Sequence, residues 1–485
     1  MFLRAAPFTA VVLLVAACTP DRPAAPRLEA SNVATAARVA SVVDVSRDTT
    51  AQNETPLAFN PTNPANLLTG ANDWNFNDGC AYNASLDGGK TWTATLPNGF
   101  IPGLTRFTND PSVPGTGFYD AAGDPGTAFG PDGAAYFVCQ AFNFTPPYQI
   151  ALFVSRSTDG GVTWSAHPMQ VSTWTGNGKS KGSNGQFPDH ESMVVDNNPA
   201  SPFYGTLYVT WVEFNGNSHS PVFVSYSRDG ARTFSPPAQI TASTVRNNQD
   251  ARIAIAPDGR AFLTFDNGIQ GNKGTALYVS ASGDGGASWS APLQFGSMVN
   301  PVCEFPPFCA NLSGGAFRAG GSYPAPAFDP VRGRLDVVYA DIVNGEAQIF
   351  FTSAVASDLT DWSVPSVIAP TAAGDRFEGE LSIAPNGRLD ASFYDRSYSG
   401  NALLDVTYAQ STDGGTTWTA TRVTSAGFDP SQYGVPSGAG IRPFVGDYNG
   451  MVSTNDRVGI TWTGVGPTFG RLNTNLEIYF ASVAP

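Results

Sequence analysis

An eight-residue pattern that recurs along the chain constrains the fold more than any other feature of the sequence. Its full form is Ser-x-Asp-Gly-Gly-x-Thr-Trp, and full or near-full copies span residues 85–92, 157–164, 227–234, 282–289 and 411–418. A degenerate copy at 357–362 falls in the interval before the last one. The final aromatic residues of successive copies are 55 to 73 residues apart. A repeat of this length in a chain of short strands indicates the blades of a β-propeller.

The residue types in the pattern are those of a tight turn. The aspartate can accept backbone N–H groups within the turn, the glycines can adopt positive φ, and Ser and Thr can bond locally. The terminal Trp can bury its ring against a neighbouring strand or blade. Copies follow strand-like runs such as 150–155, 222–226 and 277–281. We therefore expect each copy to join the third and fourth strands of a blade.

A second repeat, an apolar run followed by a Pro/Asn/Asp/Gly turn, marks the first two strands of each blade. Its copies span 57–61, 127–131, 193–197, 253–257, 325–329 and 381–385, with a poorer seventh at 444–448. There are thus seven inner hairpins but only six outer turns. The chain ends in a third strand, 476–482, and residues 39–45 can supply the missing fourth. Such closure would remove an open sheet edge.

These patterns predict an all-β fold, a seven-bladed β-propeller of four-stranded antiparallel blades in which the N-terminal strand closes the last blade. A six-bladed propeller is the fallback. Length alone would allow about three domains, but the repeats run through almost all of 39–485. The 51 Gly and 38 Pro among 485 residues disfavour long helices. The net charge of −14 argues against nucleic-acid partners, which are bound by clustered Lys and Arg.

The eight-residue pattern resembles the Asp-box, or BNR, repeats of the sialidase-like superfamily, and the resemblance covers residues 39–485. It implies a propeller whose Asp boxes lie on the outer rim, away from the site. The aspartates of the pattern are then structural; they are Asp87, Asp159, Asp229, Asp284 and Asp413. The resemblance is specific for fold and less so for activity.

Propellers place function where the innermost strands converge, so the starts of these strands hold the candidate site residues. The acids expected there to bind substrate are Glu54, Asp124, Glu191, Asp250, Glu378 and Asp447. Side chains alternate along a strand, so only about half of such a set would face the opening. The alternative is that these acids bond strand edges or neighbouring blades. As a group they indicate an acidic funnel.

Sialidases use three arginines on a substrate carboxylate, a Tyr nucleophile paired with Glu, and an Asp as acid. In this chain the resemblance offers Arg252 and Arg442 as anion clamps, Tyr448 with Glu380 or Glu378 as the nucleophile pair, and Asp189 or Asp124 as the acid. The family's Arg-Ile-Pro motif is missing, because the first inner strand reads Glu54-Thr55-Pro56-Leu57. Another glycoside hydrolase would need only two carboxylates.

The expected function is therefore binding or hydrolysis of glycans, as a sialidase-type exo-glycosidase if the chain is an enzyme. The alternative is a non-catalytic propeller that scaffolds other proteins. No cofactor is expected, although oxygen-only Ca²⁺ binding in the funnel, with Asp120, Asp124 and Asp447, stays open. We expect glycans or glycoconjugates as partners and a monomer.

The first eighteen residues form a secretory signal: Arg4 supplies the positive charge and 8–17 the apolar region. The stretch ends Val15-Ala16-Ala17-Cys18, which resembles a bacterial lipobox and implies lipidation of Cys18. Ordinary signal cleavage is the alternative. A flexible tether at 19–38 then precedes the propeller at 39–485. The expected location is the bacterial cell envelope, facing the periplasm or the exterior, with the lipid as the sole membrane contact.

Four further cysteines suit disulfides in an exported chain. Cys303 and Cys309 are close in sequence and form the first expected pair, which leaves Cys80 and Cys139. None of them has the spacing of a zinc site.

Overall fold

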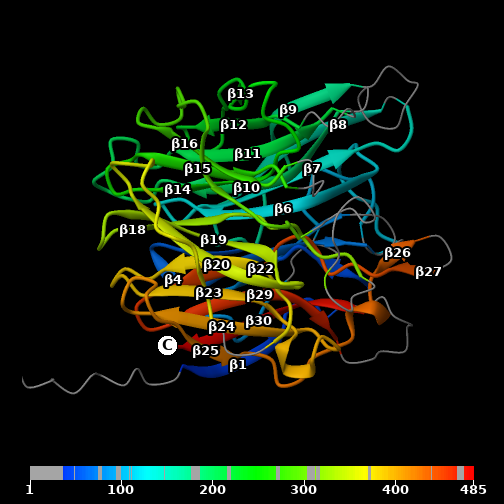
Figure 1. Ribbon diagram of the computed structural model, residues 1–485. Helices are drawn as coiled ribbons and strands as arrows, with labels where there is room; N and C mark the ends of the chain where they lie inside the picture. The colour runs from blue at the N-terminus through cyan, green and yellow to red at the C-terminus, as the bar shows by residue number, and fades with distance from the viewer. Residues whose placement is uncertain are drawn as a thin grey trace, which may run out of the picture. The chain divides into compact units, whose positions relative to one another are not determined.

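Seven antiparallel sheets account for most strands of the chain in the computed structural model, and together they form an all-β, seven-bladed propeller of four-stranded blades (Figure 1). The structure describes residues 37–47, 50–74, 79–93, 100–108, 110, 112–146, 148–175, 186–215, 220–268, 274–302, 312, 317–369, 373–437, 440–466 and 475–485. All of them belong to one compact unit, 36–485. Within these residues, no helix is long and apolar enough to span a bilayer.

The blades follow one another along the chain, each running from its innermost to its outermost strand. Blade 1 contains β2 (Gln52–Asn53), β3 (Leu57–Asn60), β4 (Asn63–Asp73) and β5 (Gly79–Ser85). Blade 2 contains β6 (Ala121–Phe129), β7 (Ala135–Phe142), β8 (Gln149–Ser157) and β9 (Met169–Thr175). Blade 3 contains β10 (Phe187–Val195), β11 (Leu207–Phe214), β12 (Val222–Ser227) and β13 (Ala238–Gln239). Blade 4 contains β14 (Gln249–Ile255), β15 (Ala261–Asp266), β16 (Ala276–Ser282) and β17 (Leu293–Ser297).

The second half of the chain completes the ring. Blade 5 contains β18 (Ala325–Asp329), β19 (Arg334–Val343), β20 (Glu346–Val355) and β21 (Ser366–Val367). Blade 6 contains β22 (Arg376–Ile383), β23 (Leu389–Asp395), β24 (Asp405–Ser411) and β25 (Thr419–Arg422). Blade 7 contains β28 (Gly450–Ser453), β29 (Val458–Val465), β30 (Leu476–Ala484) and the N-terminal β1 (Arg38–Asp44). A separate hairpin, β26 (Val435–Ser437) and β27 (Gly440–Arg442), precedes blade 7.

The closing role of the N-terminal strand is confirmed. β1 pairs antiparallel with β30, from Arg38 opposite Ala484 to Asp44 opposite Tyr479. The two strands, blue and red, lie side by side in Figure 1. Blade 1 is the least regular blade, since its inner strand is divided and single bridges, Ala84 to Thr93 and Ala81 to Phe100, stand in place of its outer strand.

The inner strand of blade 7 lies later than predicted, at Gly450–Ser453 rather than at 444–448. Gly446 has φ 106°, which a residue with a side chain rarely adopts, and its backbone passes against Glu54 of blade 1. Two residues on, the carbonyl of Tyr448 accepts the N–H of Thr55. Residues 444–448 therefore connect blades 6 and 7 to blade 1 instead of forming a strand.

The eight-residue repeats form the turns between third and fourth strands, as predicted; we call these the repeat turns. In one of them, Asp159 accepts the hydroxyl of Ser157 at 2.7 Å and the backbone N–H of Thr163 at 2.8 Å. The terminal ring reaches the preceding blade: Trp92 packs edge-on against Phe480 of blade 7, with centroids 5.2 Å apart. Each repeat turn thus satisfies its own backbone and also joins two blades.

Candidate functional site

Inner strands of five blades are interrupted near their starts by a residue in the left-handed region. The residues are Glu54 (φ 64°), Asp124 (55°), His190 (53°), Asp250 (52°) and Glu378 (51°). In β6, β10, β14 and β22 the register shifts at this point, which marks a β-bulge. A bulge re-aims the side chains of a strand, and contacts across the ring show that these side chains converge. We call these five residues, with Asp447 of the blade 7 connection, the axial cluster.

His190 is the centre of the cluster and links it across the ring. Its Nδ1 lies 3.5 Å from Oδ1 of Asp250, and its Nε2 lies 3.4 Å from Oδ2 of Asp447 and 3.5 Å from the hydroxyl of Tyr323. Burial lowers the pKa of His190, but the two carboxylates outweigh it and raise the pKa well above its usual value. The imidazole is therefore held as a cation between two aspartates.

A second cation, Arg318, contacts the same carboxylate oxygen of Asp447 as His190 does. Its Nη2 lies 2.7 Å from Oδ2 of Asp447, and its guanidinium carbon lies 3.9 Å from the ring centroid of Phe444. Burial raises the pKa of Asp447, and Arg318 and His190 together bring it below the usual value. Arg318 was not among the sequence candidates, because it lies in a glycine-containing segment outside both repeats. Its position shortly before an inner strand is the signal that could have found it.

Arg252 neutralises two carboxylates from different blades. Its Nε lies 2.8 Å from Oδ1 of Asp250, and its Nη1 lies 2.7 and 2.8 Å from the two carboxylate oxygens of Glu380. These partners raise the pKa of Arg252 despite its burial. Burial raises the pKa of Glu380, which Arg252 only partly offsets. The guanidinium therefore faces protein carboxylates.

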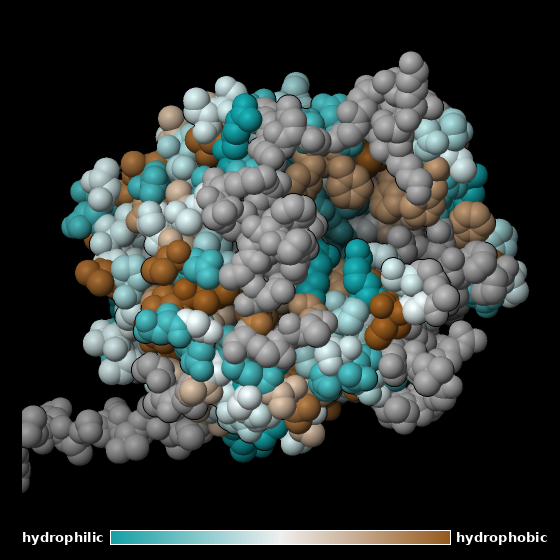
Figure 2. Space-filling view, turned by 45° about the vertical axis from the view of Figure 1, so that its right-hand side comes forward, coloured by the Kyte–Doolittle hydropathy of each residue, from teal (hydrophilic) through white to brown (hydrophobic). Residues whose placement is uncertain are grey.

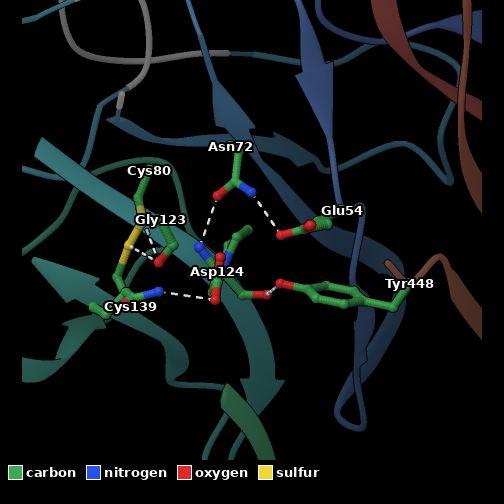
Figure 3. Close-up of a disulfide and its surroundings, with 9 residues drawn as sticks. Glu54, Asn72, Cys80, Gly123, Asp124, Cys139 and Tyr448 are labelled. Atoms are coloured by element: carbon green, nitrogen blue, oxygen red, sulfur yellow. Dashed lines mark hydrogen bonds between the residues drawn. A yellow bond between two sulfur atoms is a disulfide. The ribbon is translucent and has the colours of Figure 1, made fainter. Parts of the chain in front are cut away.

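Asn72 connects the acids of blades 1 and 2 (Figure 3). Its amide nitrogen donates to Oε2 of Glu54 at 2.6 Å, and its amide oxygen accepts the backbone N–H of Asp124 at 2.7 Å. Nε2 of Gln140 donates to Oδ2 of Asp124 at 2.8 Å. Asp124 is only half-buried, whereas Glu54 is fully buried. One carboxyl group of this pair can therefore meet a ligand from solvent, and the other stands behind it.

A disulfide fastens the strands behind Asp124. Cys80 of β5 and Cys139 of β7 are joined across blades 1 and 2, and both sulfur atoms lie 3.3 Å from the carbonyl oxygen of Gly123 (Figure 3). Cys18, Cys303 and Cys309 lie outside the described residues.

The acids of the axis fall into two electrostatic groups. Burial raises the pKa of Glu54, Glu191 and Glu378 well above the usual value for a glutamate. The pKa values of Asp250 and Asp447 are lowered instead, because Arg and His partners outweigh burial. Protonated and ionised carboxyl groups thus lie within one cluster, an arrangement that acid–base catalysis uses.

A cavity of about 250 Å³ continues from the cluster along the channel and is lined by the inner strands of all seven blades. Glu191, Arg252, Glu380 and Tyr448 line it together with His190 and Asp250. Asp189 is half-buried and accepts Nε2 of Gln249 at 2.5 Å. Among the described residues, no group of three or more His, Cys, Asp or Glu side chains is placed to hold a metal ion.

The residues predicted for a sialidase-type reaction are only partly brought together. Arg252 and Glu380 are in contact, but the hydroxyl of Tyr448 donates to the carbonyl of Pro125 at 2.9 Å. Burial and nearby acids raise the pKa of Tyr448. Arg442 lies in β27, with an exposed side chain whose guanidinium carbon is 5.6 Å from the ring of Phe444, and not on an inner strand as predicted. Glu378 accepts the backbone N–H of Gly320 at 2.9 Å.

One face of the molecule, on the right of Figure 1, carries a hollow. Figure 2 brings this face forward and shows hydrophilic side chains within the hollow, with more apolar groups on the upper rim. The β26–β27 hairpin lies on the same side in Figure 1.

No protein-family model and no curated protein matches the sequence. Solved structures do match the fold. An ulvan lyase, described as a new family of polysaccharide lyase, is similar with a TM-score of 0.51 and 10% identity over 90% of this chain and 95% of that chain. The intramolecular trans-sialidase of Ruminococcus gnavus gives 0.45 and 13% over 76% and 97%, and the alpha-L-arabinanase of Penicillium chrysogenum gives 0.45 and 13% over 74% and 92%. At these identities the similarity establishes the propeller fold alone.

Proposed function

We propose that the protein binds glycans at the face where its inner strands begin and hydrolyses a glycosidic bond there. The observation that carries this proposal is the axial cluster: five inner strands place a residue other than glycine at positive φ at nearly the same point. Such backbone conformations cost free energy and are concentrated at functional sites. The similarity of the fold to an ulvan lyase agrees with a carbohydrate ligand.

The chemistry would use two carboxyl groups. Glycoside hydrolases pair a protonated acid with an ionised carboxylate. Burial and the neighbouring Asp124 raise the pKa of Glu54 well above its usual value, and Asn72 donates to the Glu54 carboxyl group and accepts the backbone N–H of Asp124. Asp124, which is half-buried, would meet the sugar as nucleophile or base, and Glu54, buried behind it, would supply the proton through one water molecule.

A sialidase-type reaction is the more specific alternative, and it would need different residues of the same site. It would need Arg252 and Arg442 on the substrate carboxylate and Tyr448 as the nucleophile. Arg252 already faces Asp250 and Glu380, and Tyr448 donates to Pro125. These contacts favour a neutral sugar over an anionic one.

The test is turnover of a panel of fluorogenic neutral glycosides and one sialoside by the purified protein. We expect release from a neutral glycoside, and at least about a hundredfold loss of kcat in Asp124→Asn, since a positioned acid–base group contributes on this scale. Glu346→Gln, which removes an acid at the start of β20, is the control. Release from the sialoside alone, abolished by Tyr448→Phe, would replace this chemistry with the sialidase type.

The second candidate is a non-catalytic propeller that scaffolds other proteins. It is favoured by the pairing of His190, Arg252 and Arg318 with protein carboxylates, which leaves the axis largely self-neutralised. Glycan binding without turnover would leave binding as the function. Neither binding nor turnover by a folded protein would favour the scaffold.

We also propose that the protein is a monomer anchored in the bacterial cell envelope through a lipid on Cys18. The lipobox sequence supports this, with 1–18 as the signal and 19–38 as a tether. Cys18→Ser should move the protein from the membrane fraction to the soluble fraction after expression in a bacterial host. Equal partition of both forms would contradict the anchor.

A further inference from the structure

Glu191 is a buried acid in the channel that the proposed reaction does not use. It is 3% exposed, and among the described residues no other residue donates a hydrogen bond to either carboxylate oxygen; only its own backbone N–H approaches the group and lowers its pKa. Buried polar groups are nearly always hydrogen-bonded, because leaving one unpaired is costly. Its side chain lines the cavity of about 250 Å³. The unpaired carboxyl group therefore has space in front of it for a hydrogen-bond donor.

The groups around Glu191 favour a positive charge in that space. Asp124 and Asp189 raise its pKa and His190 lowers it, while Tyr448 also lines the cavity. The charge of His190 is already shared between Asp250 and Asp447. Arg252, the other cation that lines the cavity, is held by Asp250 and Glu380. Both cations are thus committed to carboxylates other than Glu191.

The other walls of the cavity are apolar. Met193, Ile253, Leu381 and Met451, from four different blades, line it beyond the polar residues. Ile383, the last residue of the inner strand β22, is half-exposed. Solvent therefore reaches the ends of the inner strands beyond the cavity. The cavity therefore combines one unpaired acid with an aliphatic wall.

We propose that this cavity is a separate binding site for a primary ammonium group carried on a short aliphatic body, with Glu191 as its counter-carboxylate. An ammonium group has three donors on a compact charge, and the two oxygens of Glu191 can accept two of them. No group of three or more acidic, His or Cys side chains among the described residues could hold a metal ion, which favours an organic cation. The aliphatic walls suit the remainder of such a ligand.

This site is independent of the proposed glycan reaction, because it uses Glu191 and not Asp124 or Glu54. Binding should also release a proton. Burial raises the pKa of Glu191 well above its usual value in the free protein, and an ammonium partner stabilises the ionised form. The released proton must be assigned by substitution, because several other titratable or charged groups face the same region: Asp124, Asp189, His190, Asp250, Arg252, Glu380 and Tyr448.

The experiment is titration calorimetry of the purified full chain with n-hexylamine, glucosamine, n-hexanol and KCl or CaCl₂, in two buffers of different ionisation enthalpy. We expect n-hexylamine to bind with a buffer-dependent enthalpy, and n-hexanol not to bind. Glu191→Gln, which keeps the side-chain volume, should weaken amine binding at least tenfold and abolish proton release. Glu346→Gln should bind as the wild type does. Glucosamine tells whether an amino sugar can supply the ammonium group.

Three results would overturn the proposal. Amine binding that is equal in Glu191→Gln would place the ligand elsewhere. Equal binding of n-hexanol would show that the charge plays no part. Stabilisation by K⁺ or Ca²⁺ that is lost in Glu191→Gln, without amine binding, would make the ligand an inorganic cation. Glycan turnover with no amine binding would refute this site and leave the proposed function standing.

Discussion

The acids of the repeat turns and the acids of the channel have the same functional group and opposite electrostatics. Asp87, in a repeat turn, is exposed, and hydrogen bonds led by that from the hydroxyl of Thr91 lower its pKa to about 2. Glu54 and Glu191 are buried, and desolvation raises their pKa values. The first group is satisfied by residues within five positions in sequence. The pKa values of the second group are raised further by a charged residue of another blade, Asp124.

The comparison separates two uses of a carboxyl group. A repeat turn brings its own donors, so its aspartate stabilises the turn and is ionised at neutral pH. The axial cluster places acids at backbone angles that are themselves unfavourable, and the donors that reach these acids lie elsewhere in the sequence, as Asn72 does for Glu54 and Arg318 for Asp447. A carboxyl group that is costly to bury and easily protonated is a candidate for function, whereas a fully bonded one indicates structure.

The largest expected effect concerns the disulfide behind Asp124. Cys80 and Cys139 are 59 residues apart, so the loss of their bond in Cys80→Ala/Cys139→Ala should cost about 4 kcal/mol of unfolding free energy through the entropy of the unfolded chain. Urea denaturation with and without reductant checks this. Reductant should lower the stability of the wild type towards that of the variant. An equal loss in both proteins would mean that another bond is responsible.

Removing Arg252 should have the next largest effect and would show that the channel acids depend on distant partners. Arg252→Ala leaves Glu380 buried without its cation, which should cost about 3 kcal/mol, the lower end for a buried pair because the guanidinium is 16% exposed. The measurement is again urea denaturation. Adding Glu380→Gln to this variant should recover part of the loss. If the loss of unfolding free energy is no larger than for a surface ion pair, then Glu380 behaves like the exposed acids of the repeat turns.

The pH dependence of stability should distinguish the two groups of acids directly. The folded-state pKa of Glu191 is raised. Below its unfolded-state pKa of about 4.3 the carboxyl group is protonated in both states and does not change the free energy of unfolding. As pH rises above that value, the group destabilises the wild type. Glu191→Gln should therefore match the wild type near pH 4 and be more stable at pH 7. The stability curves should diverge by up to about 1.4 kcal/mol per pH unit over this interval. Parallel curves would mean that Glu191 is ionised in the folded protein.

The smallest effect is expected in the repeat turns. Asp159→Ala removes acceptors for Ser157 and Thr163 and should cost about 1 to 2 kcal/mol, without changing glycan binding or turnover. Asp159→Asn, which keeps one acceptor oxygen, should cost less. A loss of activity in either variant with stability retained would contradict a purely structural role for the turn.

Much of the fold could be predicted because its signals are local. Ser157, Asp159 and Thr163 make their bonds within the turn that they specify, so the pattern is readable in sequence. The closing strand followed from the count of hairpins and turns. The predicted start of blade 7 was wrong because residues 444–448 contact blade 1 through Gly446 and Thr55. No local sequence pattern indicates this contact.

The candidate site was less predictable, because its contacts are long-range. The sequence located acids near the channel, among them Glu54 and Asp250, but not the left-handed backbone that aims them inward. The pairing of Arg318 with Asp447 joins residues 129 positions apart, and Tyr448 reaches Pro125 across 323 positions. Tyr448 and Glu380 were predicted to act as a pair. Both line the cavity, but Tyr448 binds Pro125 and Glu380 binds Arg252.

The pairing of β1 with β30 also sets an order for biosynthesis. The first strand that the structure describes, Arg38–Asp44, has its place only against Leu476–Ala484, so the ring cannot close until residues 476–484 have left the ribosome. At 5 to 20 residues per second this delay is roughly half a minute or more. During it β1 has no partner strand, and its free edges can pair with other chains. A host that makes this protein must therefore keep β1 from associating until β30 meets it.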